Sequence, residues 1–495
     1  MRQKTRKPID EMQIDQVKLD PHSRDDIPQL LKGLQYIFLN PILLAQVLKI
    51  LDDLFPKEID LNNGRPGMDM WSILVLGVLR LNLNCDYDRL HNLVNNHNTI
   101  RQILGHGLVD DQSGYYLQTV KDNVSLLTPE MLDQINQVVV NAGHALIKKK
   151  ELGDDPWPDR GAEDPLRGRC DSFVVETNVE YPTDTRLLFD SVRKVIQLLI
   201  RLCRRHQVEE STGVTDIKKL KKLWRHLQKL KPSTSKDESK QAARQKEIIE
   251  AHQAYLDLAR ELVERADRQL EELEKTDGMD NNKILKIEDF MKHAQRQMDQ
   301  TDRRVIQGKK IPHQEKVFSI FKPYTEWISK GKAGVPVELG VLVGIIEDQH
   351  RFILHHRVMQ QEVDVDVAVR MIQETKQRFP QLSSCSFDQG FHSPGNQREL
   401  AGLLETVILP KKGRLSKTDQ VRQQAVVFIQ GRCQHAAVES AIHALEVHGL
   451  DRCPDGELPA FKRYVALAIV ARNWQILGRY LQQQDIEEER CKKAA

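Results

Sequence analysis

The segment "CSFDQGFHSPGN", residues 385–396, decides the fold that we expect for this chain of 495 residues. A run containing Leu382, Cys385 and Phe387 leads into it and predicts a β-strand that stops at Asp388. A glycine, a histidine and a Pro-Gly pair follow, which predicts a sharp turn. In α/β sheets, ligands bind at the carboxyl ends of strands. Asp388 is therefore a candidate site residue.

The sequence around this strand predicts an α/β sheet that begins at Cys170. The expected order is a strand, a long helical stretch, a hairpin of two strands, and then a helix, a strand, a helix, a strand and further helices. The ranges are 170–180, 185–304, 336–348, 350–360, 365–379, 382–388, 395–404, 406–411, 433–449 and 459–481. This order resembles that of the RNase H-like fold, in which the first strand is central.

The residues before the sheet predict several short helices. "PILLAQVLKILDDLF" begins with a proline at a suitable first-turn position, and the helix from Pro129 has Thr128 as its N-cap. Short helices with tight turns suit a helix-turn-helix DNA reader, and they suit an ordinary helical bundle equally well. Both readings stay open on the pattern alone.

A basic segment lies within the long helical stretch. "KKLKKLWRHLQKLK", residues 218–231, contains seven Lys or Arg residues and no acid. Its leucines recur at helical spacing, so one face can pack while the other is cationic. A solvated face is the ordinary explanation, and the absence of acids favours phosphate binding. The candidate DNA-binding residues here are Lys218, Lys219, Lys221, Lys222 and Arg225.

The cysteines and the apolar runs indicate where in the cell the protein is expected. Seven scattered cysteines without a CxxC spacing argue against a zinc site and a disulfide framework. The first residues lack the apolar region of a secretory signal, and "WSILVLGVL" is too short to span a bilayer. We therefore expect a cytoplasmic protein with no membrane partner, although the net charge of +2 does not itself indicate nucleic acid.

Three carboxylates on separate predicted elements form the candidate site. Asp171 lies inside the first strand, Asp388 ends a later strand, and Glu439 lies on a helix. Each has an ordinary explanation as a turn former, cap or exposed residue. Together they suit Mg²⁺, which prefers oxygen ligands, and two such ions about 4 Å apart can assist phosphodiester displacement.

At these residues the chain resembles the DDE transposases of bacterial insertion sequences, and most closely the group filed as not classified yet. "CDSFVVETNVEYPTD" is similar to the first-Asp motif, "FDQGFHSPGN" to the second-Asp motif, and "VESAIHALEVHGL" to the Glu helix. The resemblance covers roughly residues 64–481. It implies that Asp171, Asp388 and Glu439 are catalytic and bind two Mg²⁺ ions, for which Mn²⁺ can substitute.

The same resemblance implies the activity and the partners. The enzyme would bind the double-stranded ends of its insertion sequence, cleave there, and join the 3′-OH ends to target DNA. It would act as a homodimer or higher oligomer on DNA and be nucleoid-associated when bound. Where related families carry basic residues beside the Glu, this chain offers Arg432, His435 and His443, and it has an acidic Glu446. Arg432 joins the candidate DNA-binding residues.

The expected fold class is thus an α/β RNase H-like catalytic core with a large all-helical insertion after the first strand, preceded by an all-α N-terminal DNA-binding region. The expected parts are a flexible N-terminus, a helical DNA-binding domain, a linker, the first part of the core, the insertion, and the remaining core with C-terminal helices. Their ranges are 1–26, 27–150, 151–169, 170–184, 185–304 and 305–495.

Other functions stay open. A catalytically inactive DNA-binding regulator and an RNase H-like nuclease without transposition both fit the same residues. A purely helical scaffold fits less well, because it leaves the carboxylates on the strands unexplained. Trp224 and Trp327 are candidates for stacking on a base, and the alternative for each is burial in a helix-packing face.

Overall fold

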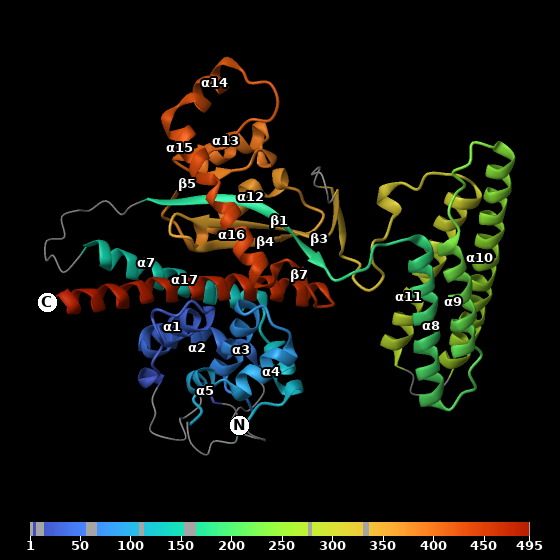
Figure 1. Cartoon of the computed structure of the whole chain (residues 1–495), viewed down its shortest axis with the longest axis horizontal. Coiled ribbons are helices and arrows are strands. Elements are labelled where there is room, and N and C mark those ends of the chain that lie inside the picture. The colour runs from blue at the N-terminus through green and yellow to red at the C-terminus, as the bar shows by residue number, and fades with distance from the viewer. Residues whose placement is uncertain are drawn as a thin grey trace. The chain divides into compact units, whose positions relative to one another are not determined.

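The computed structural model describes the chain at residues 3–5, 14–55, 67–107, 113–152, 165–275, 280–329 and 336–494. The chain divides into two compact units (Figure 1). Unit 1 comprises Met1–Asn178 and Ile328–Ala495, and unit 2 comprises Val179–Trp327. Unit 2 encloses the predicted helical insertion, 185–304, and extends beyond it on both sides. Most of the predicted linker, 153–164, lies outside the described residues.

Unit 1 begins with short helices, as the sequence predicts. Polar side chains cap many of them: Asn40, for example, accepts from the backbone N–H groups of Ile42 and Leu43. Thr128 and Pro129 also take their predicted places, since Thr128 Oγ1 accepts from the Met131 N–H at 3.3 Å. The helices are α1 Asp26–Leu39, α2 Pro41–Leu51, α3 Met70–Asn82, α4 Tyr87–Asn96, α5 Asn98–Ile103, α6 Leu117–Val124 and α7 Pro129–Leu152.

α1, α3 and α7 pack on the last helix of the chain, α17, Leu458–Ala494. The backbones of α1 and α17 approach closely, because a Cβ added at Gly33 would lie 2.5 Å from the Trp474 carbonyl oxygen. Every residue of α3 is buried. The helices of 27–150 therefore share one compact unit with the sheet. Residues 14–25 also take part, since the Gln35 side chain donates to the Ile14 carbonyl at 2.7 Å.

Unit 1 also contains a mixed sheet, for which the structure describes seven strands in a mixed α/β arrangement. The order β2-β3-β1-β5-β6 places β1 at the centre, antiparallel to β3 and parallel to β5. β4 pairs with β3, and β7 pairs with β1. The strands are β1 Leu166–Thr177, β2 Glu326–Ser329, β3 Val337–Asp348, β4 Ile353–Met359, β5 Leu382–Phe387, β6 Thr406–Ile408 and β7 Arg452–Cys453.

The helices between these strands agree with the prediction in order, with one correction. α12, Asp364–Arg378, covers one face of β1, where its Met371 Sδ lies 3.9 Å from Cys170 Sγ. α13 is Pro394–Leu403. The single helix predicted over 433–449 is wrong. The structure has α14 Lys417–Gln424, α15 Val426–His435, α16 Ala437–Leu445 and a π-helical turn Glu446–Leu450, in which Gly449 takes a φ of 101° that ends the helical path.

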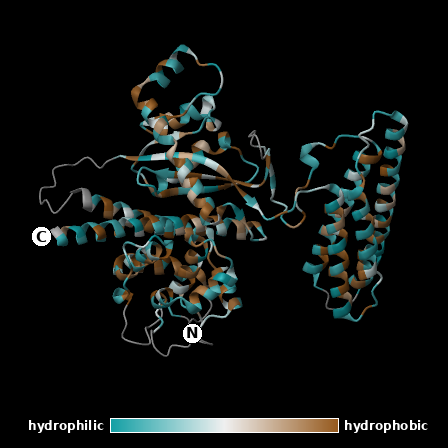
Figure 2. Cartoon of the chain, viewed as in Figure 1, coloured by the Kyte–Doolittle hydropathy of each residue, from teal (hydrophilic) through white to brown (hydrophobic). Residues whose placement is uncertain are grey.

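Unit 2 consists mainly of four helices around one hydrophobic core. Each helix carries hydrophobic and hydrophilic residues (Figure 2), and the hydrophobic ones form that core. Trp224 is buried and stacks on Phe189 with ring centroids 5.1 Å apart, so it packs the core. The helices are α8 Asp184–His206, α9 Val214–Lys229, α10 Glu238–Glu274 and α11 Asn281–Thr301.

No single helix among the described residues has the length and apolar composition to cross a membrane. Asp26–Leu39 and Pro41–Leu54 reach that composition only as a pair bent by 94°.

Candidate functional site

Asp171 lies within β1, and Asp388 directly follows the end of the neighbouring strand β5, at the same level of the sheet. In the parallel register of β1 and β5, Cys170 is paired with Phe387. The next residues along the two strands are Asp171 and Asp388. Because neighbouring strands lie about 4.8 Å apart, the two carboxylates start from adjacent backbone positions. The structure therefore brings together two of the predicted site residues that are far apart in the sequence.

Glu439 and His435 lie on two helices that follow the strand β6 in the chain. Glu439 lies in the first turn of α16, and His435 is the last residue of α15. The His435 Nδ1 is 3.0 Å from the Ser386 Oγ, which ties the end of α15 to β5. Burial lowers the pKa of His435, while the negative charges of Asp388 and Glu439 act in the opposite direction. Both carboxylates therefore lie within electrostatic reach of this histidine.

A fourth carboxylate, Asp364, joins the group. It is the first residue of α12, and its Oδ1 accepts a hydrogen bond of 2.6 Å from the Ser172 Oγ. Its Oδ2 faces the turn after Asp388, because a Cβ added at Gly390 would lie 2.8 Å from that oxygen. Asp364 thus contacts the residue that follows Asp171 and also the turn that follows Asp388.

The sequence did not single out Asp364. An acid in the first turn of a helix has an ordinary role, because it interacts favourably with the helix dipole. The available signal was position: the "VDVDV" segment, residues 363–367, opens the helix directly after the predicted hairpin. Its approach to β1 and β5 depends on how α12 packs on the sheet, which the local pattern does not contain.

Charge is concentrated among these carboxylates. The pKa of Asp171 is raised to about 7, mainly because the side chain is withdrawn from water and further because Asp388, Asp364 and Glu439 are negative. The Ser172 N–H donates to Asp171 Oδ1 at 2.8 Å and offsets part of this effect. Burial also raises the pKa of Asp364, and the charge of Asp388 adds to that rise. A bound cation would favour the ionised form of each carboxylate.

The residues fit Mg²⁺ in their chemistry. The group supplies carboxylate oxygens, which Mg²⁺ prefers, from β1, from the residue after β5, and from the first turns of α12 and α16. As these side chains stand, no three His, Cys, Asp or Glu residues in the described part of the chain converge as a metal site. Donor type and charge favour a cation, and coordination would require the side chains to draw closer.

The three basic candidate residues near Glu439 in the sequence differ in their placement in the structure. His435 lies next to the carboxylates, as described above. Arg432 is exposed on α15 and makes no ion pair with any residue that the structure describes. His443 is exposed and its Nδ1 is 3.8 Å from the Glu446 carboxylate. Of the three, only His435 is placed to act at the carboxylates, and Glu446 has a partner in His443.

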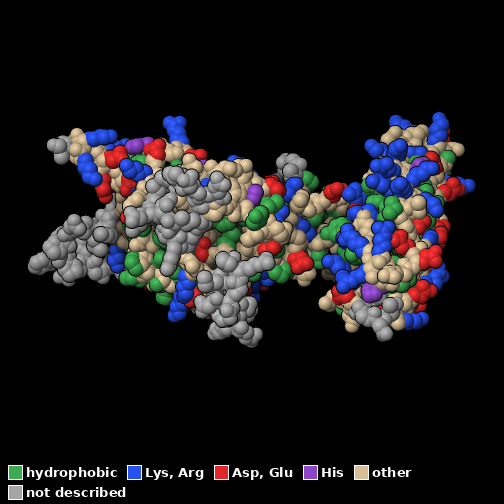
Figure 3. Space-filling view, turned by 90° about the horizontal axis from the view of Figure 1, so that it is seen from below, with side chains coloured by type: hydrophobic (Ala, Val, Ile, Leu, Met, Phe, Trp, Pro, Cys, Tyr) green, Lys and Arg blue, Asp and Glu red, His purple; other side chains and the backbone are tan. Residues whose placement is uncertain are grey.

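The basic segment forms one face of α9. A surface depression of about 490 Å³ is lined by Lys218, Lys221, Lys222, Arg225, His226 and Lys229. Figure 3 shows Lys and Arg side chains gathered on the surface of unit 2, on the right of the view. Lys219 differs from the other predicted residues, because its Nζ is 3.7 Å from Asp216. Within the described ranges, none of the lining cations forms an ion pair, so their charge is available to a phosphate backbone.

Comparison with known protein families, with curated proteins and with solved structures gives no match for this chain.

Proposed function

We propose that this chain is a metal-dependent DNA strand-cleaving and strand-joining enzyme, a DDE transposase with an RNase H-like core. The observation that carries the proposal is the adjacency of Asp171 and Asp388 in the β1–β5 register, with Glu439 within electrostatic reach. The sheet holds two carboxylates side by side although their charges repel. A bound catalytic cation would offset that repulsion and would account for the arrangement. The chain order of strands and helices supports the same proposal.

In this proposal Asp171, Asp388 and Glu439 hold the metal ions. Bound Mg²⁺ supplies Lewis acidity for the attacking oxygen and the leaving oxygen of a phosphodiester. The chain itself supplies placement: β1 and β5 fix the two aspartates, and the Ser172 N–H orients Asp171. His435, held by Ser386, would place a ring nitrogen beside the same group.

DNA contact would come from two surfaces. The unpaired cations of α9 suit the phosphate backbone and carry no sequence information. In the N-terminal helices, α3 is fully buried and is excluded as a reading helix. α4 exposes Arg89, Asn92 and Asn96, and Arg and Asn are side chains that read base edges in the major groove. We therefore assign base contacts to α4 within this proposal.

The test is cleavage of a plasmid that carries the gene's own flanking DNA. Wild type, Asp388→Asn and the control Glu446→Gln would be compared in Mg²⁺ and in EDTA, with binding to the same DNA measured in parallel. We expect Mg²⁺-dependent nicks at the flanks with wild type and Glu446→Gln, and none with Asp388→Asn, while all three bind. Joining of the new ends to a second plasmid separates a transposase from a nuclease. Binding without cleavage by wild type would establish the inactive regulator instead.

A further inference from the structure

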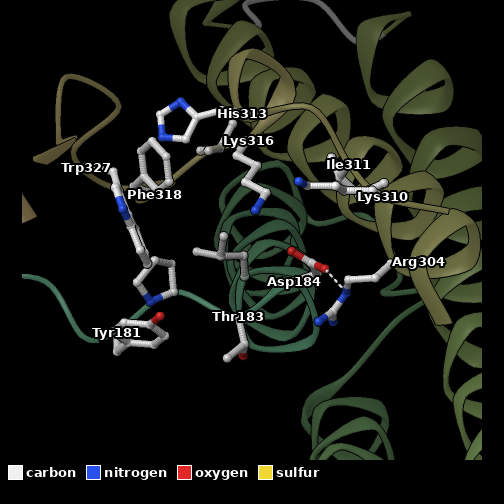
Figure 4. A pocket seen from close by; sticks show the side chains of 13 residues that line it. Tyr181, Thr183, Asp184, Arg304, Lys310, Ile311, His313, Lys316, Phe318 and Trp327 are labelled. Carbon is white, nitrogen blue, oxygen red and sulfur yellow. Dashed lines mark ion pairs between the residues drawn. The ribbon is translucent and has the colours of Figure 1, made fainter. Parts of the chain in front are cut away.

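A pocket of about 480 Å³ lies within unit 2, where the chain enters α8. The segment Tyr181–Asp184 forms one part of it (Figure 4). The rest is formed by Leu187 of α8, by residues that follow α11, from Arg304 to Phe318, and by Trp327. The proposed strand chemistry does not use any of these residues. The volume falls within the range of about 300–1,000 Å³ that small-molecule sites occupy.

Aromatic rings form one wall of this pocket. The ring centroids of Tyr181 and Trp327 are 5.7 Å apart, and those of Phe318 and Trp327 are 5.6 Å apart. Tyr181 is 66% exposed, which is unusual for a residue that packs a core. Figure 4 shows these three rings on the same side of the pocket. The planes of Tyr181 and Trp327 are 65° apart, so a flat aromatic ligand can stack on one of these rings and meet the other at its edge.

Two ammonium groups face that wall. Figure 4 shows the side chains of Lys310 and Lys316 pointing into the space beside the rings. In the described part of the chain neither lysine forms an ion pair. Arg304, by contrast, is neutralised by Asp184 at 2.7 Å. The pocket thus combines an aromatic wall with two positive charges that form no ion pair with any described residue.

We propose that this pocket binds a nucleotide, with the base stacked on the Trp327 ring beside Tyr181 and the phosphate between Lys310 and Lys316. The aromatic rings offer a surface on which a base can stack, and the two lysines offer positive charge for a phosphate. The nucleotide comes either from an unpaired position in a DNA strand or from a free nucleotide. The proposal is independent of the carboxylate site, because binding here requires neither metal nor cleavage.

The test uses the full chain in EDTA, so that failure of cleavage does not affect it. The probe is a single-stranded oligonucleotide carrying 2-aminopurine, whose fluorescence falls when it stacks. The second arm uses a duplex in which the same base is paired. The third arm adds AMP as a competitor. Trp327→Leu and Tyr181→Leu remove the wall, and Trp327→Phe keeps an aromatic ring. A Lys310→Ala/Lys316→Ala pair removes the charges, and Lys309→Ala is the matched control, because Lys309 is exposed but does not line the pocket.

We expect wild type and Trp327→Phe to quench the single-stranded probe, and Trp327→Leu to lose that quenching. The lysine pair should weaken binding about tenfold or more, while Lys309→Ala should leave it unchanged. Displacement of the probe by AMP shows that a free nucleotide can occupy the site. Quenching that persists with AMP, and that the paired duplex does not show, indicates an unpaired nucleotide of the strand. Far-ultraviolet circular dichroism and the melting temperature would show that each variant is folded. Equal quenching by wild type and by both leucine variants would overturn the proposal.

Discussion

Asp364 shows how one side chain can link two strands that carry site residues. It accepts from the Ser172 hydroxyl and lies against Gly390. Ser172 follows Asp171, and Gly390 lies two residues after Asp388, so Asp364 acts through their neighbours. We therefore describe Asp364 as a positioning residue for the proposed reaction, distinct from the three carboxylates that we propose to bind metal.

Substitutions of Asp364 test whether its carboxylate positions neighbouring residues or binds the metal itself. Asp364→Asn keeps an oxygen that can accept from Ser172, so we expect cleavage close to the wild-type rate. Asp364→Ala removes that oxygen, and we expect a loss of about 10–100-fold. The measurement is the initial rate of plasmid nicking as a function of Mg²⁺ concentration. If Asp364→Asn were as inactive as Asp388→Asn, Asp364 would itself bind the metal.

Gly390 provides a second test of the same contact. A Cβ there would stand 2.8 Å from Asp364 Oδ2, so Gly390→Ala should displace the turn after Asp388. We expect cleavage to fall about tenfold or more, because small displacements of reacting groups are costly. In an Asp364→Ala background the oxygen is gone, and the added methyl group should cause little further loss. Equal losses in both backgrounds would mean that Gly390 acts independently of Asp364.

At the residue level the sequence identified side chains by their local setting. Asp388 ends a strand and Asp171 interrupts an apolar one, and both features can be read from the alternation of residues. The structure shows these two side by side. Asp364 and the distinction between His435 and Arg432 depend on how α12 and α15 pack on the sheet. No local pattern in the sequence records that packing.

At the scale of elements, α9 has one face in the core and one that is basic. Lys221→Glu with Lys222→Glu should flatten the salt dependence of DNA binding, by about 0.9 in the slope of log K against log salt for each lost phosphate contact. Filter binding across a salt series measures this slope. The control is Lys240→Glu with Lys246→Glu on α10, because each of these lysines has an acidic neighbour within 4.0 Å. A similar change in both pairs would indicate a general effect of net charge.

Long elements were more predictable than short ones. The periodic helices and the strands of the hairpin match the prediction, because many residues repeat the same signal. β2 and β7 have four and two residues and were not predicted. The break between α15 and α16 was also missed, since "CQHAAVESAIHALEVHG" is apolar and periodic throughout. Tertiary packing, including the contact of His435 with Ser386, accompanies that break.

At the scale of the molecule, each unit has its own core, and the two should unfold separately. Differential scanning calorimetry should therefore show two transitions. Leu262 is fully buried in the core of unit 2, so Leu262→Ala should destabilise that unit by about 2–5 kcal/mol and shift one transition. Leu477→Ala, at a fully buried position of α17, should shift the other. A shift of the same transition by both variants would show that the units unfold together.

The division into units was only partly visible in the sequence. The change from helical to strand periodicity marks the insertion, because that signal is local. The packing of the N-terminal helices on α17 is not local. Gly33 and Gly478 lie at this crossing, and only their proximity in the fold explains why both are glycines. A pattern within one window of sequence does not reveal which distant segment covers it.

The packing of α1 on α17 also affects how the chain can fold while the ribosome is synthesising it. Gln475 Nε2 donates to Asp26 Oδ1 at 2.8 Å, so the start of α1 is joined to the last helix of the chain. During translation α1 and α3 leave the ribosome long before α17 exists, and the apolar surface that they pack against α17 stays uncovered until then. Unit 2 is complete much earlier and has a hydrophobic core of its own. A ribosome that stops before α17 would therefore release a folded bundle attached to helices with exposed apolar surface, which is a substrate for chaperones and proteases.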